Sequence, residues 1–536
     1  MEWQVGETLN DVDGAEDQFG RVIVLSQDGT VMAISSPDYS SNTGRVRVFA
    51  LTNGAWVQRG ESMVGESNND RSGRAIDLSG DGTVIAIGAQ YNNDNTGHVR
   101  VYAWSAGAWT QRGSDINGML AEEEFGRRLR LSRDGTVLAV GAPYSGTGHV
   151  RVYVWTGGLW AQRGDELIGL ESNDQFGYDV ALSADGTVLA VGAPANQSDR
   201  GVVGVYKWAS NVWTLRDDFI IGNAENNRFG NSVDLSANGS VLAVGAPDSD
   251  LYRGHASVLV WDGDAWQARD EITGSEIDET FGRFVRISAD GTVLAVGVPT
   301  GADVVGTGFV SVFAWRNGSW AARGDRMYGL VDGDNFGRGL ALSDDGTVLA
   351  IGAPNHNNDA GYVSVFRWRN TYPCFHGSVW LPTAAGGVRA SNVRVGMLLV
   401  AEDGGRHRVR NVTRTANARC VCIHAGAFGP NVPSEPVILT PTHLVRLPAG
   451  NIVPAGHLVS LPSQVPGQTA ASIVPQPLTV YHVGVDDWVF VRAHNLSFET
   501  LAWKPAHYAQ RHARPAARSA TARFFRLKAR GRSGSK

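Results

Sequence analysis

Residues 131–143 read LSRDGTVLAVGAP, a short polar turn followed by an apolar run that ends in Gly-Ala-Pro. An Asp-Gly pair between strand-like segments is a strong signal for a β-hairpin. The apolar run Thr136–Gly141 has the composition of a strand that is buried on both faces. The stretch therefore predicts two antiparallel strands joined by a tight turn.

This stretch occurs seven times, at intervals of 51 to 55 residues. A fixed period of this size is typical of stacked supersecondary units. The position of the turn aspartate in the successive copies is Asp28, Asp81, Asp134, Asp185, Asn238, Asp290 and Asp345.

Each unit is predicted to contain four short strands. In the third unit these are Arg128–Leu131, Thr136–Gly141, His149–Trp155 and Leu159–Arg163, with a Gly-Gly turn before the last. Four-stranded units repeated around an axis form a β-propeller, which leaves only short, protected strand edges. We therefore predict a mainly β protein with a seven-bladed β-propeller over residues 1–370.

Tryptophans predict how the ring closes. Most units carry two tryptophans five residues apart, whereas the last unit has only Trp368 and the segment around Trp3 matches the missing partner. We expect the residues near Trp3 to supply the outer strand of the last blade. The complete pairs are Trp104/Trp109, Trp155/Trp160, Trp208/Trp213, Trp261/Trp266 and Trp315/Trp320.

The repeats resemble the FG-GAP repeats of integrin-α-type propellers through their Phe-Gly and Gly-Ala-Pro motifs, for example at Phe125 and Gly141. The calcium loop of that family has several aspartates at alternate positions, and here only one remains before the glycine. We therefore interpret Asp28 and its counterparts as turn residues and expect neither a metal nor a cofactor. A calcium-dependent adhesin would need loops that the sequence lacks. No convergent catalytic set occurs in the repeats, so the propeller is predicted to be non-enzymatic and to bind a protein or surface ligand.

Acidic loops precede the Phe-Gly motifs. Because equivalent loops of a propeller lie on one face, we expect an acidic face that could attract a basic partner. The alternative is a solvated surface that keeps the ring soluble. Examples of the loops are residues 11–17, 122–124, 171–174, 276–279 and 332–334.

The charge distribution predicts a boundary near residue 373. Residues 374–536 contain 19 Lys+Arg and 6 Asp+Glu, whereas residues 1–373 contain 28 and 47, which gives +13 and −19. Three cysteines make no disulfide framework, and no apolar run is long enough for a membrane span. No secretory signal is visible at the N-terminus, so we expect location inside a cell or particle, or secretion if the true start is missing.

The sequence after residue 373 is again rich in predicted strands but lacks the propeller period. It begins with Cys374-Phe375, continues with Val-x-Val-Gly-x-x-Leu at 393–399, and contains Leu-Thr-Pro-x-His-Leu at 439–444. In this order the motifs resemble the Hint domain that Hedgehog C-terminal regions and inteins share. The resemblance implies an all-β autoprocessing domain over residues 374–503, preceded by a linker at 371–373 that holds the scissile bond.

The resemblance also implies the chemistry. Cys374 is the expected nucleophile, which attacks the carbonyl of Pro373 through a five-membered ring and converts the amide to a thioester. His443 is the expected general acid that protonates the leaving amine. Thr440 is expected to orient or polarise the scissile bond. Self-cleavage of this kind is autocatalytic and runs once per molecule.

Departures from the family pattern limit the reactions that are expected after the thioester forms. Pro373 stands where Hedgehog proteins often have glycine, and its ring crowds the carbonyl. No aspartate matches the one that activates cholesterol, and His494-Asn495 is followed by Leu496, so neither sterol transfer nor splicing is expected. Thioester hydrolysis by water, or capture by a small thiol, remains. The alternative is a non-cleaving interaction or adhesion protein with an inactive Hint domain.

Two features carry weaker predictions. Cys420 and Cys422 have no second Cys/His pair at zinc spacing and are interpreted as strand residues. Residues 504–536 contain ten Lys+Arg and no Asp or Glu, which predicts a disordered basic tail. Such a tail could bind an anionic partner such as nucleic acid, fold back on the acidic propeller, or stay solvated.

Overall fold

The chain divides into two units, residues 1–370 and residues 371–536. The computed structural model describes residues 2–11, 16–299 and 306–369 of the first unit and only the strands of the second. None of the helices in this described part has the length and hydropathy of a membrane span.

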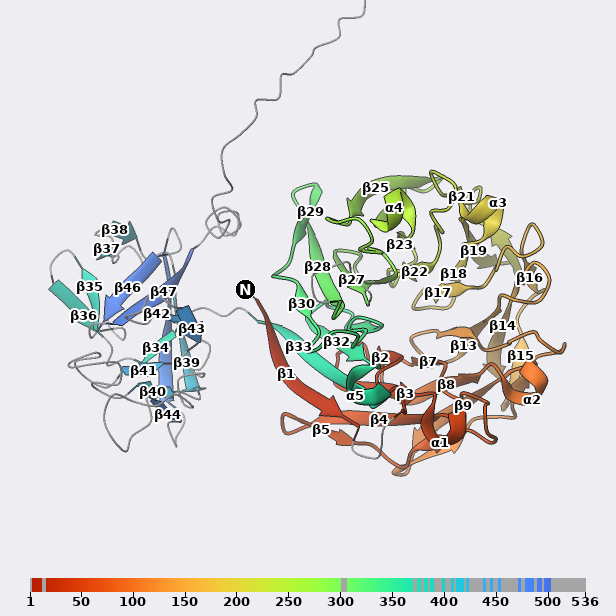
Figure 1. The fold of residues 1–536 in the computed structure, drawn as a ribbon, viewed down its shortest axis with the longest axis horizontal. Helices are drawn as coiled ribbons and strands as arrows, with labels where there is room; N and C mark the ends of the chain where they lie inside the picture. The colour runs from red at the N-terminus through yellow and green to blue at the C-terminus, as the bar shows by residue number, and fades with distance from the viewer. Residues whose placement is uncertain are drawn as a thin grey trace, which may run out of the picture. The chain divides into compact units, whose positions relative to one another are not determined.

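The first unit consists of seven antiparallel sheets around a common axis (Figure 1). Six sheets carry their four main strands in chain order. The first strands are β2 (Ile23–Leu25), β7 (Ala75–Leu78), β12 (Arg128–Leu131), β17 (Asp179–Leu182), β22 (Ser232–Leu235), β26 (Phe284–Ile287) and β31 (Gly339–Leu342). The second strands are β3 (Val31–Ser36), β8 (Val84–Ala89), β13 (Val137–Ala142), β18 (Val188–Ala193), β23 (Val241–Ala246), β27 (Val293–Val298) and β32 (Val348–Ala353).

The outer half of each blade holds the tryptophan pairs. The third strands are β4 (Arg45–Thr52), β9 (His98–Ser105), β14 (His149–Thr156), β19 (Val202–Ala209), β24 (His255–Trp261), β28 (Phe309–Arg316) and β33 (Tyr362–Arg369). The fourth strands of the first six blades are β5 (Ala55–Gln58), β10 (Ala108–Gln111), β15 (Leu159–Gln162), β20 (Val212–Leu215), β25 (Trp266–Thr273) and β29 (Ser319–Ala322). This is the seven-bladed propeller that the repeat predicts.

The N-terminal strand completes the seventh blade. β1 (Glu2–Asn10) pairs antiparallel with β33 and places Trp3 opposite Trp368. The Trp3 indole N–H donates to the Arg323 carbonyl at 2.8 Å, which ties the strand to the sixth blade. Figure 1 shows β1 beside β33, which is the pairing expected from the tryptophan spacing.

The recurring Asp-Gly turn stabilises itself through side-chain hydrogen bonds. In the third unit Asp134 Oδ1 accepts from the Ser132 hydroxyl at 2.6 Å and from the Thr136 backbone N–H at 3.0 Å. Ser132 Oγ in turn accepts from the Val137 backbone N–H at 2.9 Å. Gly135 has φ +65°, a conformation that favours glycine. The interpretation of these aspartates as turn residues is consistent with this geometry.

The seven turns also form a closed ring of backbone hydrogen bonds. Each turn donates an N–H to the carbonyl of the next, from Gln27 through Gly80 and onward, at 2.7 to 3.0 Å. The last of these bonds runs from Asp344 N–H to the Gln27 carbonyl at 3.0 Å and closes the circle. The first and seventh blades are therefore joined at this end as well as through β1.

Apolar side chains are buried between neighbouring blades. In each of the seven second strands, from β3 to β32, all six residues are buried. Phe125 of the Phe-Gly motif is fully buried, in one cluster with Val84 of the preceding blade and Leu138 of its own. The following Gly126 has φ +89°, and a Cβ on Gly88 would lie 2.1 Å from the Gly126 carbonyl oxygen. Phe-Gly thus fills the space between blades and lets their backbones approach.

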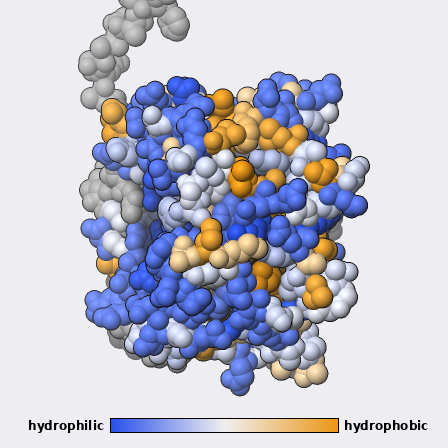
Figure 2. All heavy atoms as spheres, turned by 90° about the vertical axis from the view of Figure 1, so that its right-hand side faces the viewer, coloured by the Kyte–Doolittle hydropathy of each residue, from blue (hydrophilic) through white to orange (hydrophobic). Residues whose placement is uncertain are grey.

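Hydrophilic residues cover most of the outer face of the propeller that Figure 2 displays, and hydrophobic residues gather there in small groups. Five short strands that the sequence did not indicate extend the blades. Each pairs with the first residues of a third strand, beyond the segment that pairs with the fourth strand. They are β6 (Met63–Val64), β11 (Ile116–Asn117), β16 (Leu167–Ile168), β21 (Ile220–Ile221) and β30 (Met327–Tyr328). Single-turn helices follow five of the second strands, at α1 (Tyr39–Asn42), α2 (Asn92–Asn95), α3 (Asn196–Asp199), α4 (Ser249–Tyr252) and α5 (His356–Asp359).

The described part of the second unit is all β, and its strands form two sheets. The larger sheet holds β34 (Cys374–His376), β39 (Asn411–Ala418), β40 (Val421–Ile423), β41 (Val437–Leu439), β42 (Leu444–Arg446), β43 (Ile452–Pro454), β44 (Ala471–Ile473), β45 (Leu478–Val485), β46 (Val489–Ala493) and β47 (Leu496–Ala502). The smaller sheet holds β35 (Trp380–Thr383), β36 (Gly386–Arg389), β37 (Leu398–Val400) and β38 (Arg406–Arg408). The predicted basic tail, residues 504–536, lies outside the described residues.

Candidate functional site

Cys374 is the first residue of β34, the first strand of the second unit. The strand lies inside the larger sheet, between β45 on one side and β41 on the other. Pro373, on the other side of the predicted scissile bond, lies outside the described residues. The candidate nucleophile is therefore fixed in the backbone of a sheet.

Backbone register brings the motif at 439–444 to the same strand. Phe375, the residue after Cys374, pairs with Leu439, the last residue of β41. Thr440 follows Leu439 in the chain, and His443 immediately precedes β42. Thr440 and His443 themselves lie outside the described residues. The strand that carries Cys374 thus pairs with the strand that leads directly into the predicted Thr-x-x-His motif.

A histidine that the sequence analysis did not single out occupies the register position opposite Cys374. His482 of β45 pairs with Cys374 on one side and with Thr413 of β39 on the other. Directly opposed residues of an antiparallel pair are nearest neighbours across the two strands. The available sequence signal was a polar, titratable residue within the otherwise apolar run 478–485.

Comparison with protein families finds one match in this region. The family model described as "Hint domain" matches residues 373–505. Residues 373–505 are a Hint domain. The match begins one residue before Cys374, so it includes both residues of the predicted scissile bond.

Within the Hint domain, the structure places one of the two remaining cysteines in a strand. Cys422 lies in β40, opposite Ile438 of β41 and Ser472 of β44. Cys420 lies outside the described residues. A strand position for Cys422 agrees with its interpretation as a strand residue.

Solved structures resemble the chain only distantly. Hydrazine synthase of Kuenenia stuttgartiensis is 13% identical with a TM-score of 0.46, and the match covers 69% of this chain and 97% of that one. A protein described as a 6-phosphogluconolactonase of Bacteroides uniformis is 14% identical with a TM-score of 0.46, covering 65% and 92%. Comparison with curated proteins found no match. At these values neither structure bears on the function of this chain.

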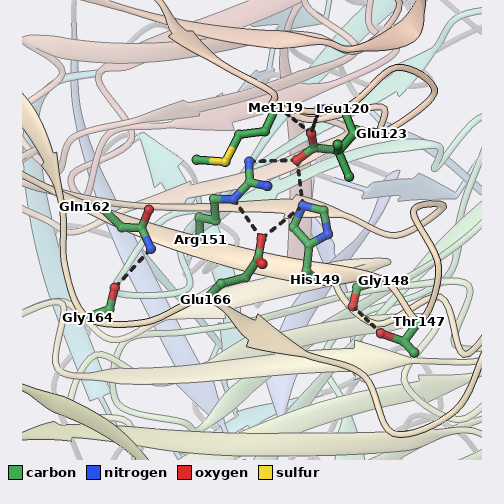
Figure 3. A network of polar contacts seen from close by, with 10 residues as sticks. All are labelled: Met119, Leu120, Glu123, Thr147, Gly148, His149, Arg151, Gln162, Gly164 and Glu166. Carbon is green, nitrogen blue, oxygen red and sulfur yellow. Dashed lines mark hydrogen bonds and ion pairs between the residues drawn. The ribbon is translucent and has the colours of Figure 1, made fainter.

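Some acidic side chains in the loops of the propeller are buried and form hydrogen bonds and ion pairs within the protein. The side chain two positions before each Phe-Gly is buried, and in the loop that leads from the second blade into the third it is Glu123. Figure 3 shows this carboxylate accepting from the backbone N–H groups of Met119 and Leu120 and contacting His149 and Arg151, each at 2.7 Å. The counterparts of Glu123 are Asp17, Asp70, Asp174, Asn227, Glu279 and Asp334, which are at most 7% exposed.

This burial lowers the number of loop acids that contribute charge to the expected acidic face. Burial raises the pKa of Glu123, but hydrogen bonds from His149 and the two backbone amides, with Arg151 nearby, hold it at about 2. The carboxylate is therefore ionised, and Arg151 of β14 offsets its charge. Loop acids were counted from the sequence as surface charge, whereas one of them in most loops is a structural anchor.

One cluster in the described residues has the composition of a metal site. Ligand atoms of Glu66, His98 and Asp115 lie within 4.8 Å of one another. Arg100 forms ion pairs with both carboxylates, and the one to Asp115 measures 3.1 Å. One guanidinium already bridges both acids, so we interpret the cluster as an ion-pair network on the blade surface.

Proposed function

We propose that this chain is a self-processing precursor whose Hint domain cleaves the Pro373–Cys374 bond and releases the propeller. The observation that carries the proposal is the register of β34, which holds Cys374 beside the strand leading into Thr440 and His443. The match to the Hint family, which starts at residue 373, supports the same position for the cleavage.

The proposed reaction begins with an N-to-S acyl shift. The Cys374 thiolate attacks the Pro373 carbonyl carbon and forms a tetrahedral intermediate. Collapse of this intermediate breaks the C–N bond and leaves residues 1–373 as a thioester on the cysteine sulfur, with a free Cys374 amine. Water or a small thiol then attacks the thioester, which frees the sulfur and yields fragments 1–373 and 374–536.

A proton must leave the thiol and another must reach the departing amine, so two basic groups suit the reaction. We assign protonation of the amine to His443 and orientation of the scissile bond to Thr440. We assign removal of the thiol proton to His482, because its register position is opposite Cys374. An imidazole suits both tasks because its pKa lies near neutrality.

The released fragment would be a closed ring, because β1 and β33 complete the seventh blade before residue 370. Its Phe-Gly and Gly-Ala-Pro motifs resemble FG-GAP repeats, and we propose that it binds a protein or surface ligand. A second candidate rests on Pro373: if its rigid ring blocks attack, the chain is a non-cleaving interaction protein with an inactive Hint domain.

Intact mass of the full chain, fresh and after incubation with dithiothreitol, tests the proposal. Wild-type protein is expected to yield masses of 1–373 and 374–536, with the thiol accelerating cleavage. Cys374→Ala is expected to stay intact, and Cys422→Ala, a second cysteine of the same domain, is the matched control that still cleaves.

The roles assigned to the two histidines are tested by their own substitutions. His443→Ala and His482→Ala are both expected to slow cleavage, and the His482 variant is expected to recover partly as pH rises, since base then removes the thiol proton. Uncleaved wild-type chain that ignores thiol, with a Pro373→Gly variant that does cleave, would establish the second candidate. If neither protein cleaves, the catalytic assignment is wrong.

A further inference from the structure

Arginines surround one mouth of the axial channel of the propeller. The residue after each Phe-Gly leads into a first strand, and five of the seven blades place arginine there. In the second blade Ser72-Gly73 stands in place of Phe-Gly. The five residues are Arg21, Arg74, Arg127, Arg283 and Arg338.

A cavity lies at this mouth. It is lined by Arg21, Arg74, Arg128 and Arg338, from four different blades, and by Asp179. About 60 Å³ is open to the centres of water molecules, which is room for several waters or one small anion. The guanidinium groups therefore converge on a space that a ligand can enter.

Most of these guanidinium groups form no ion pair with another described residue. Among the described residues, Arg128 pairs with Asp179 at 3.5 Å, while Arg21, Arg74 and Arg338 form no ion pair. The Nε atoms of Arg21 and Arg74 are buried and have no hydrogen-bond partner in the described part of the chain. Buried polar groups are normally hydrogen-bonded, so these donors indicate a missing acceptor.

The pKa values of residues at this mouth shift in the direction that excess positive charge predicts. Burial, followed by repulsion from neighbouring guanidinium groups, lowers the pKa of Arg21 to about 8 and that of Arg74 to about 9. Burial raises the pKa of Tyr178, but arginines on several sides, led by Arg128 and Arg228, bring it below its usual value. A guanidinium stays protonated in proteins, so its charge is held here at an electrostatic cost.

Other arginines near the axis have carboxylate neighbours. Arg130 and Arg286 also line this cavity, but they are buried among the carboxylates of Asp77 and Asp234. At the opposite end, where the turns form their ring, Arg133 pairs with Asp344 across the channel. Among the described residues, Arg130, Arg286 and Arg133 therefore have carboxylates close by, whereas Arg21, Arg74 and Arg338 form no ion pair.

We propose that the arginine mouth (Arg21, Arg74, Arg128 and Arg338) is a binding site for a tetrahedral oxyanion of the phosphate type. Planar guanidinium groups pair strongly with such oxygens. A tetrahedral anion offers three or four oxygens in different directions and suits donors that converge from several blades, whereas a carboxylate offers two in one plane. The anion supplies the acceptors that the buried Nε atoms lack.

Calorimetric titration of the full chain with inorganic phosphate and with phenyl phosphate, in a chloride buffer of constant ionic strength, tests the proposal. Phosphate is kept at a few millimolar, because higher concentrations stabilise proteins without binding them. Binding of inorganic phosphate alone assigns a free anion, and binding of both compounds assigns a phosphate carried on a larger molecule. Arg74→Gln is expected to weaken binding about tenfold or more, and Arg316→Gln, at an exposed strand end, is the matched control that binds as wild type.

Thermal unfolding separates a ligand site from a structural role. Without phosphate, Arg74→Gln is expected to unfold at the wild-type temperature or above, because it removes a repelling charge. With phosphate, the wild type is expected to gain several degrees more than the variant. Absence of binding, binding that Arg74→Gln leaves unchanged, or loss of stability of Arg74→Gln without phosphate would each overturn the proposal.

Discussion

Replacing Glu123 with alanine is expected to destabilise the propeller strongly, because one buried carboxylate holds together parts of two blades. Its oxygens accept from the loop amides of Met119 and Leu120 and pair with His149 and Arg151 of the next blade. Removing one partner of a buried ion pair costs roughly 3–5 kcal/mol. Here the Met119 and Leu120 amides lose their acceptor, and among the described residues Arg151 keeps only the more exposed Glu166 as an ion-pair partner.

That cost translates into a measurable shift. The entropy of unfolding is about 2.1 cal/mol/K per residue, and the propeller spans residues 1–370. The expected fall in the melting temperature is therefore about 4–6 °C. Tryptophan fluorescence reports it well, since 13 of the 16 tryptophans lie in residues 1–370.

The matched control is Glu166→Ala. Glu166 pairs with the same Arg151 at 2.7 Å, but its side chain is 36% exposed, so its loss is expected to cost about 1 kcal/mol or less. Equal effects of the two substitutions, or a Glu123→Ala shift below about 1 °C, would refute the view that the buried loop carboxylate is a structural anchor.

Three further predictions follow from the same geometry. The pKa of Glu123 is lowered in the folded state to about 2, so its contribution to stability is complete above pH 4.5 and is lost as pH falls toward 2. The free energies of unfolding of wild type and Glu123→Gln, measured by denaturation across this range, should therefore converge as pH falls. A difference that stays constant would contradict the ionised carboxylate. Arg163 stacks 4.7 Å from the Trp208 ring centre and donates to the Gly186 carbonyl at 2.9 Å. Arg163→Lys should therefore lower the free energy of unfolding by about 1–2 kcal/mol. Arg316→Lys, at an exposed strand end, is the control and should leave it unchanged. Deleting residues 1–10 removes β1, and limited proteolysis near β33 should accelerate more than about tenfold; an unchanged rate would show that the seventh blade is stable without its N-terminal strand.

The propeller could be predicted from sequence because its decisive signals are local and repeated. The Asp134 turn bonds within six residues, and the Trp104/Trp109 spacing reflects direct opposition across one hairpin. Glu123 was misjudged because its burial depends on His149 and Arg151, which come from the next blade. The arginine mouth was missed for the same reason, since residues about 50 positions apart meet only when the ring closes.

In the Hint domain the ordered motif predicted the family, and the role of Cys374 as nucleophile stays a prediction. His482 was not recognised because its significance depends on a strand pairing between residues more than 100 positions apart. Register of this kind cannot be read from spacing alone.

The pairing of β1 with β33 also sets an order of events during synthesis. The ribosome must reach residue 369 before the ring can close, since the first and last strands of the propeller share one blade. A further 163 residues follow from Cys374 onward, which take roughly 8–30 s at about 5–20 residues per second. Because the Hint domain is translated after the propeller, an emerging chain has time to close the seven-bladed ring before the domain proposed to cut it is complete.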